Sequence, residues 1–186
     1  MYVIPEISKE EAENILSQKR TFLPIRFRKK TVPLKRVELI HLPFYLFDVM
    51  VVGQTEIEKK KDKVTISLDG LVGDNLFFFR DNVKYKSGVD NPVCPFVLSQ
   101  SEAQQAAVDK YKWQRLEQGL RMKQKYIPGE IIEVRKIFYP FWVGYFQRGK
   151  GYDFKLMDGV SGEVQGIRMR KVFLKALRHL DDSTPL

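Results

Sequence analysis

An aromatic segment from Ile137 to Gly166 limits the possible folds of this chain more than any other part of it. It predicts an aromatic strand, a basic glycine-rich turn at 148–151, a second strand at 152–157 and a tight Asp158-Gly159 turn, because Gly and Asp-Gly supply the positive backbone angles that hairpin reversals need. A weaker copy occurs earlier, where LPFYLFDVMVVG is followed by VTISLDGLVG. The sequence therefore predicts two related antiparallel hairpins.

Each hairpin is preceded by a predicted helix. The Ser-x-x-Glu spacing of a capping box begins both helices, at 8–11 and at 99–102. The first helix is expected to end near Arg20 and the second at Pro128-Gly129. The last segment, from Ile167 to Leu180, is predicted to be a strand that passes into a basic tail.

The two parts of the chain match in three places and in the same order. Ile-Ser-x-x-Glu-Ala at 7–12 matches Leu-Ser-x-x-Glu-Ala at 98–103, Pro43-Phe44-Tyr45 matches Pro140-Phe141-Trp142, and each part ends in Asp-Gly-x-x-Gly. The alternation of apolar residues at 64–68 is out of phase with the alternation at 152–156, which argues against a strict copy. We predict an α+β fold of two tandem repeats, each a helix followed by three or four antiparallel strands. The repeats are expected at 1–90 and 91–186, with one compact pseudo-symmetric domain as the alternative.

Short motifs carry a resemblance to known families. The segments at 7–12 and at 158–164, Asp-Gly-x-Ser-Gly-Glu-Val, resemble PepSY-type domains, in which a helix packs across an antiparallel sheet. The second copy also looks like a segment of uncharacterised bacterial proteins with Tyr-Pro-x-Trp, Tyr-x-Phe and Gly-x-Ser/Thr-Gly, present here at 139–142, 152–154 and 159–162. The first copy lacks the Ser-Gly-Glu part. The resemblance implies a PepSY- or cystatin-like fold and a non-catalytic binding or regulatory module, and it transfers no catalytic residue.

The composition is that of a basic globular protein. The net charge of +9, from 32 Lys and Arg against 23 Asp and Glu, favours polyanionic partners without selecting one. The longest apolar run, 42–53, is too short to cross a bilayer, and no apolar leader of signal-peptide length follows Met1. The single cysteine, Cys94, leaves no internal disulfide and no multi-cysteine zinc site. These features predict a cytoplasmic protein without a membrane span.

No group of residues has the spacing of a metal site or of a catalytic centre. His41 and His179 lie outside any metal-ligand spacing, so neither a metal nor a cofactor is expected. Asp69 and Asp158 each precede a glycine and are therefore expected to form turns. Asp48 lies in an apolar strand. It is expected either to face water at a strand edge or, if buried, to need a cationic partner such as Arg26 or Lys35.

The leading hypothesis is a binding module that catalyses no reaction. A protein partner or a small ligand would lie in a groove lined by the aromatic strands, with Tyr45, Asp48, Trp142 and Tyr145 as candidate ligand-binding residues. Packing in the core is the competing interpretation of the aromatic residues. A homodimer formed through an exposed edge strand also remains open.

The sequence also offers two other interpretations. A nucleic-acid-binding protein would use basic residues from two segments, namely Arg26, Arg28, Lys29, Lys30, Arg168, Arg170 and Lys171. A hydrolase centred on Asp48 and His41 is disfavoured, because the sequence offers no set of nucleophile, base and orienting group.

Overall fold

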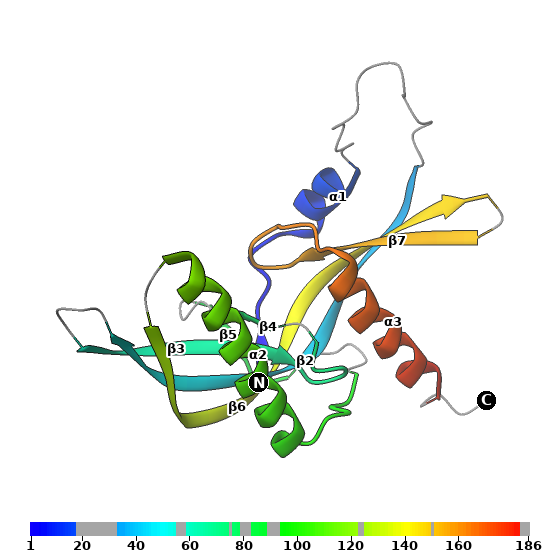
Figure 1. Ribbon diagram of the computed structural model, residues 1–186. Coiled ribbons are helices and arrows are strands. Elements are labelled where there is room, and N and C mark those ends of the chain that lie inside the picture. Colours follow the sequence, from blue (N-terminus) through cyan, green and yellow to red (C-terminus); the bar gives the residue numbers. More distant parts are fainter. Residues whose placement is uncertain are drawn as a thin grey trace.

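The computed structural model describes residues 1–17, 33–54, 59–74, 76–78, 83–88, 94–122, 125–149 and 151–182. Within these residues the chain forms three helices and one seven-stranded sheet (Figure 1). Neighbouring strands follow the order β4-β3-β2-β6-β1-β5, and β7 also pairs with β6. The elements are β1 (Tyr2–Val3), α1 (Lys9–Ser17), β2 (Leu34–Gln54), β3 (Lys59–Asp69), β4 (Leu76–Phe78), β5 (Tyr85–Lys86), α2 (Gln100–Met122), β6 (Lys125–Arg148), β7 (Gly151–Asp158) and α3 (Ile167–Asp182).

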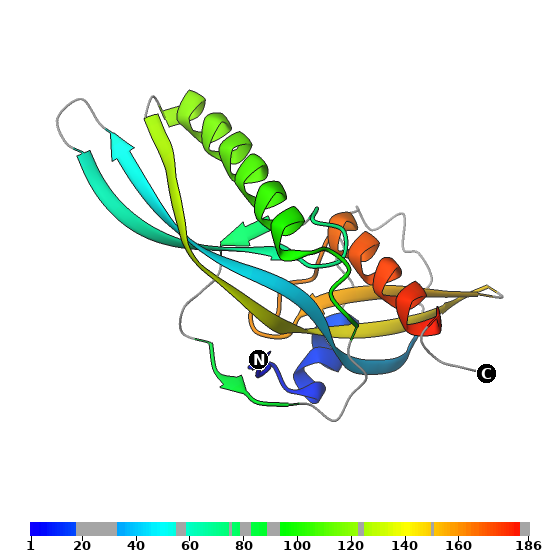
Figure 2. The same cartoon turned by 90° about the horizontal axis from the view of Figure 1, so that it is seen from below.

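Two long strands, β2 and β6, form the centre of the sheet. They pair antiparallel from Leu34 opposite Phe146 to Gln54 opposite Lys125, with shifts in register around Val49. Figure 2 shows these two twisted strands running through most of the molecule. Hairpin β2–β3 extends one half of this pair and hairpin β6–β7 extends the other half.

This shared pair of strands shows that the prediction of two tandem repeats is wrong. Each predicted repeat contributes one long strand to the same continuous sheet, so the two segments do not form separate sheets. Helix α1 packs against Trp142 and Met157 of the second hairpin, whereas α2 packs against Tyr45 and Ile66 of the first. Each helix therefore covers the hairpin of the other segment. The predicted boundary between residues 90 and 91 lies outside the described residues.

The motifs that matched in the sequence make matching contacts across the sheet. The Tyr45 hydroxyl donates to the Leu98 carbonyl at 2.8 Å, and Trp142 Nε1 donates to the Ile7 carbonyl at 3.0 Å. Leu98 and Ile7 each directly precede the serine that caps a helix. The paired tyrosine and tryptophan thus fix the starts of α2 and α1.

The Asp-Gly turns complete each helix anchor. The Gly70 amide donates to the Pro43 carbonyl at 2.8 Å, and the Gly70 carbonyl accepts from the Leu98 amide at 3.0 Å. Gly159 makes the equivalent bonds to Pro140 and Ile7, both at 3.0 Å. A side chain at Gly159 would require Pro140 to shift, because a Cβ atom there would lie only 3.0 Å from the Pro140 oxygen. The turn predictions for Asp69 and Asp158 are confirmed, since each carboxylate accepts from the backbone amides that follow it.

The predicted strand from Ile167 to Leu180 is wrong, because this segment forms helix α3. Its first four residues, Ile-Arg-Met-Arg, alternate as a strand would, but the buried residues Met169, Val172, Phe173 and Ala176 follow the helical spacing i, i+3, i+4, i+7. Burial of this stripe determines the conformation. The end of α2 was also predicted too late, since α2 ends at Met122 and β6 begins at Lys125.

Helices α1 and α2 pack against one set of β2 side chains, and α3 packs against the set that points the other way. Side chains of β2 alternate, so that Val37 and Tyr45 point toward α1 and α2, while Leu42 and Phe44 point into the cluster that contains α3. In the described part of the chain, no helix is long and apolar enough to span a membrane.

The hydroxyl of Tyr45 offers a test of the helix anchor. In the variant Tyr45→Phe the Leu98 carbonyl loses its donor, and the free energy of unfolding is expected to fall by about 1 kcal/mol in urea titrations. The matched control is Tyr152→Phe, which removes a hydroxyl from a side chain that is 75% exposed and is expected to change stability little. Equal stability of Tyr45→Phe and the wild type would contradict the proposed anchor.

Candidate functional site

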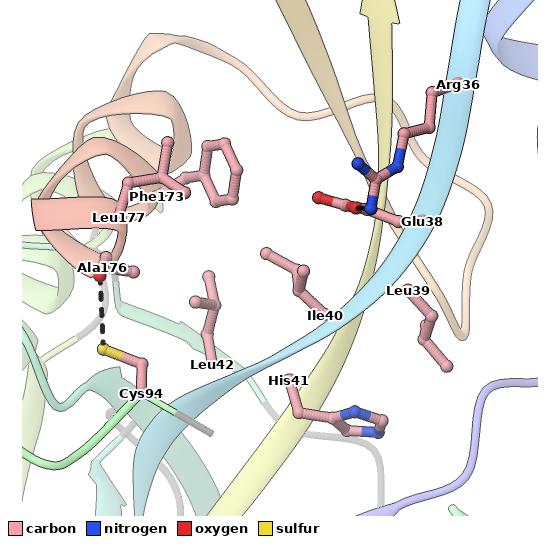
Figure 3. Close-up of a pocket in the computed structure, with 10 residues that line it drawn as sticks. All are labelled: Arg36, Glu38, Leu39, Ile40, His41, Leu42, Cys94, Phe173, Ala176 and Leu177. Carbon is pink, nitrogen blue, oxygen red and sulfur yellow. Dashed lines mark hydrogen bonds and ion pairs between the residues drawn. The ribbon is translucent and has the colours of Figure 1, made fainter. Parts of the chain in front are cut away.

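A cavity of about 350 Å³ lies between β2 and α3 (Figure 3). Ile40 and Leu42 of β2 form one wall, and Phe173, Ala176 and Leu177 of α3 face them. Cys94, which precedes α2, closes one end, with its Sγ 3.9 Å from the Ala176 carbonyl oxygen. The two facing walls are therefore apolar.

The regular alternation of β2 creates the strand side of this cavity. Glu38, Ile40 and Leu42 point toward α3, while Leu39 and His41 point to the other side of the strand (Figure 3). Among the described residues, β3 pairs with β2 only from Phe44 onward, so this earlier part of β2 has β6 as its single neighbouring strand. The cavity lies where the sheet leaves β2 without a second neighbour.

A charged group stands at the polar end of the cavity. The Arg36 guanidinium pairs with Glu38 at 2.5 Å, and the Tyr145 hydroxyl donates to the other oxygen of that carboxylate. The Arg36 side chain is 72% exposed and the Glu38 side chain 27% exposed. Burial, together with the hydrogen bond to Glu38, raises the pKa of Tyr145, so this hydroxyl stays protonated and acts as a donor. Arg36 keeps further N–H groups that a ligand can use, because one guanidinium carries five.

Of the four predicted ligand-binding residues, Tyr145 is hydrogen-bonded to a side chain that lines this cavity, Glu38. Tyr45 and Trp142 are buried beneath α2 and α1, where they hold the helix starts. Phe146 is also buried, with the Lys155 ammonium 4.8 Å from the centre of its ring. The aromatic strands thus fill the core, and the groove that they were predicted to line is occupied by helices.

Asp48 lies in a buried ion cluster away from the cavity. Its side chain is 1% exposed and binds Lys63 at 2.7 Å, Arg135 at 3.0 Å and the Thr65 hydroxyl at 2.8 Å. Burial raises the pKa of Asp48, but the hydrogen bonds from Lys63 and Thr65 and the charge of Arg135 outweigh it, so the pKa is lower than usual. Of the two predicted alternatives, exposure to water is wrong, and burial with a cationic partner is what the structure shows. The partners are Lys63 and Arg135, while the suggested Arg26 lies outside the described residues.

The other titratable candidates form no catalytic group. His41 is buried, its Nε2 lies 3.3 Å from the Val3 carbonyl oxygen, and burial lowers its pKa. His41 and Asp48 alternate to opposite faces of β2, so the structure does not bring together the pair of the disfavoured hydrolase hypothesis. No group of three or more His, Cys, Asp or Glu side chains that could hold a metal occurs in the described ranges.

The basic residues of the nucleic-acid interpretation fall into two groups. Arg26, Arg28, Lys29 and Lys30 lie outside the described residues. On α3, Arg168 and Lys171 are exposed, whereas Arg170 pairs with Asp153 at 2.8 Å and lies 4.3 Å from the centre of the Phe154 ring. Arg170 therefore has a structural role that the other two do not share.

Sequence reasoning missed most of the cavity. The alternation of Glu38, Ile40 and Leu42 was visible, and so was the helical spacing of Phe173 and Ala176. Nothing in the sequence indicated that these two segments face one another. Comparisons with protein-family models, curated proteins and solved structures gave no match. The resemblance to PepSY-type domains therefore stays a prediction.

The ion cluster predicts a pH-dependent stability difference. Because the pKa of Asp48 is lower in the folded protein than the usual value of about 3.9, its contribution is fully present above that pH and is lost as the pH falls through the folded value. Asp48→Asn is expected to lower the free energy of unfolding by about 2 kcal/mol at neutral pH, and by less at pH values below about 4.

Urea titrations at several pH values measure this difference. Asp109→Asn is the matched control, because Asp109 is exposed on α2. A difference between wild type and Asp48→Asn that stays constant with pH would contradict a charged Asp48.

The thiol of Cys94 reports on the closed end of the cavity. Burial raises the pKa of this thiol to about 11, so the thiol is protonated at pH 8. The buried side chain is also inaccessible to a reagent in solution. Reaction with Ellman's reagent at pH 8 is expected to be about 100-fold slower, or more, than in the urea-unfolded chain. The chain has one cysteine, so no other thiol contributes to the signal. Rapid stoichiometric reaction of the folded protein would show that this end is open.

Proposed function

We propose that this protein is a non-catalytic binding module and that its ligand is a small apolar carboxylate held between β2 and α3. One observation supports this proposal above all others: an apolar cavity of ligand size ends at an exposed arginine. Cavities of about 300 Å³ and more are typical of small-molecule sites, in which a few polar groups orient the ligand.

The volume limits the size of the ligand. If each non-hydrogen atom takes about 30 Å³, the share of one water molecule in the liquid, the cavity of about 350 Å³ holds about a dozen atoms. The walls of Ile40, Leu42, Phe173 and Leu177 suit a hydrocarbon chain or a single ring. A carboxylic acid of medium chain length fits both the volume and the walls.

The charges at the polar end favour an acidic head group. Arg36 binds a carboxylate through two parallel N–H groups when its pairing with Glu38 opens, and a guanidinium is well matched to such a partner. The net charge of +9 also raises the local concentration of anions. An amine would instead compete with Arg36 for Glu38, and the positive net charge of the protein would repel it.

A binding role suits the chemistry around the cavity better than catalysis. Cys94 is the nucleophilic side chain that lines it, and burial keeps this thiol protonated by raising its pKa to about 11. The side chain of His41 points to the other side of β2 and does not reach the thiol's side of the strand (Figure 3). The expected location of the module is the cytoplasm, because its single cysteine leaves no internal disulfide.

Calorimetric titration with decanoate, below its micelle-forming concentration, tests the proposal. Decanoate has about a dozen non-hydrogen atoms, and a gain of about 0.5 kcal/mol for each gives an expected dissociation constant of tens of micromolar. Decylamine and decan-1-ol carry the same chain with a cationic and a neutral head, and both are expected to bind at least tenfold more weakly. Stronger binding of decylamine would overturn the assignment of an acidic ligand.

Three variants locate the site. Arg36→Gln is expected to weaken decanoate binding at least tenfold, and Ala176→Leu to abolish it by filling the cavity. Glu38→Gln is expected to preserve or strengthen binding, because it removes a competing carboxylate. Lys35→Gln is the charge-matched control, since Lys35 is exposed on the neighbouring position of β2. Binding that survives both Arg36→Gln and Ala176→Leu would place the site elsewhere.

A further inference from the structure

The outer face of α3 combines positive charge with exposed aliphatic side chains. Ile167 is 73% exposed and Leu174 is 47% exposed, two helical turns apart. Arg168, Lys171 and Arg178 are exposed on the same helix. These five residues form one surface, called here the outer face of α3, which points away from the buried stripe that holds the helix to the sheet.

No acidic residue interrupts this surface within the helix before Asp181. A nearby described acid is Asp74, whose pKa is lowered mainly by Lys110 at 2.9 Å and less strongly by Lys171 and Arg168. Because Lys110 already neutralises Asp74, the positive charge of Arg168 and Lys171 remains available to an external anion.

We propose that the outer face of α3 docks on an anionic membrane surface. Cationic side chains on such a helix attract anionic headgroups, while aliphatic side chains beside them enter the boundary between headgroups and acyl chains. A nucleic acid would use the cations, but its phosphate backbone offers nothing to Ile167 and Leu174. The exposed aliphatic pair therefore favours the membrane over the nucleic acid.

The same helix lines the cavity. Phe173, Ala176 and Leu177 face β2 from the inner side of α3, so docking through the outer face would hold the cavity close to the membrane. This placement suits a ligand that partitions into lipid, and that link rests on the function proposed above. Docking itself does not depend on the cavity, because it involves other side chains.

Co-sedimentation of the full chain with vesicles tests the docking in the absence of any added ligand. We expect binding to phosphatidylcholine vesicles that contain phosphatidylserine and at least tenfold weaker binding to phosphatidylcholine alone. Binding is expected to weaken as the salt concentration rises from about 0.05 M to about 0.15 M, because salt screens the surface charge. Equal sedimentation with both kinds of vesicle, or with neither, would overturn the proposal.

Two variants of equal net charge test whether vesicle binding depends on the outer face of α3 or only on the overall positive charge of the protein. Replacing Arg168, Lys171 and Arg178 by Gln is expected to weaken vesicle binding about 100-fold. The control replaces the exposed residues Lys9, Lys84 and Lys112 by Gln, which removes the same charge from other parts of the chain and is expected to have less than a threefold effect. An equal loss in both variants would show that the outer face has no special role.

A charge-neutral variant distinguishes a membrane from a nucleic acid. Ile167→Gln with Leu174→Gln is expected to weaken vesicle binding about tenfold and to leave binding of a single-stranded oligonucleotide unchanged. If this double variant binds vesicles as the wild type does, and the oligonucleotide displaces the protein from them, the surface is a nucleic-acid site and the membrane proposal fails. Failure of vesicle binding leaves decanoate binding unaffected, so the two proposals are tested separately.

Discussion

The pairing of β2 with β6 determines where every other described element lies. Both strands carry apolar side chains on both faces, so each face needs a cover, and the helices supply it. The turns at Gly70 and Gly159 bind the carbonyls of Pro43 and Pro140, so each hairpin strand ends at a proline of a central strand. Because β3 ends opposite Phe44, the earlier part of β2 is left with α3 as its cover on one face. The cavity therefore follows from the unequal lengths of β2 and β3.

Two carboxylates on the same face of β2, Asp48 and Glu38, differ in how far the fold covers them. Asp48 has three close partners and almost no exposed surface, so its hydrogen-bonding capacity is used within the fold. Glu38 binds Arg36 and Tyr145 but remains 27% exposed beside an apolar cavity. Under the proposed function, an acidic ligand would take the place of Glu38 beside Arg36 without leaving a buried charge unpaired, because both groups are partly exposed to water. Asp48, the carboxylate that lies in an apolar strand, therefore has a structural role.

Local chemistry was predictable from the sequence, whereas long-range pairing was not. The capping boxes at Ser8 and Ser99 form as predicted, with the glutamate three residues on accepting from each serine amide, and so do the turns at Asp69 and Asp158. These features depend on residues within one turn of each other. The exchange of helices between the two segments depends on β2 pairing with β6, which no local pattern encodes. For the same reason Tyr45 and Trp142 were assigned to a ligand groove, although their aromatic character instead serves the packing beneath α2 and α1.

The two halves of α3 make different contacts with the rest of the fold. The first half is fixed by the ion pair of Arg170 with Asp153 and by the contact of Phe173 with Phe154, whose ring centres lie 4.9 Å apart. Beyond Phe173, Ala176 and Leu177 belong to the same apolar core and also line the cavity. Under the proposed function, a ligand in the cavity would bury further apolar surface against this second half of the helix. Arg168 and Lys171 belong to the first half of α3, whereas Leu174 and Arg178 of the outer face belong to the second half, so under the two proposals a bound ligand would affect only part of the docking surface.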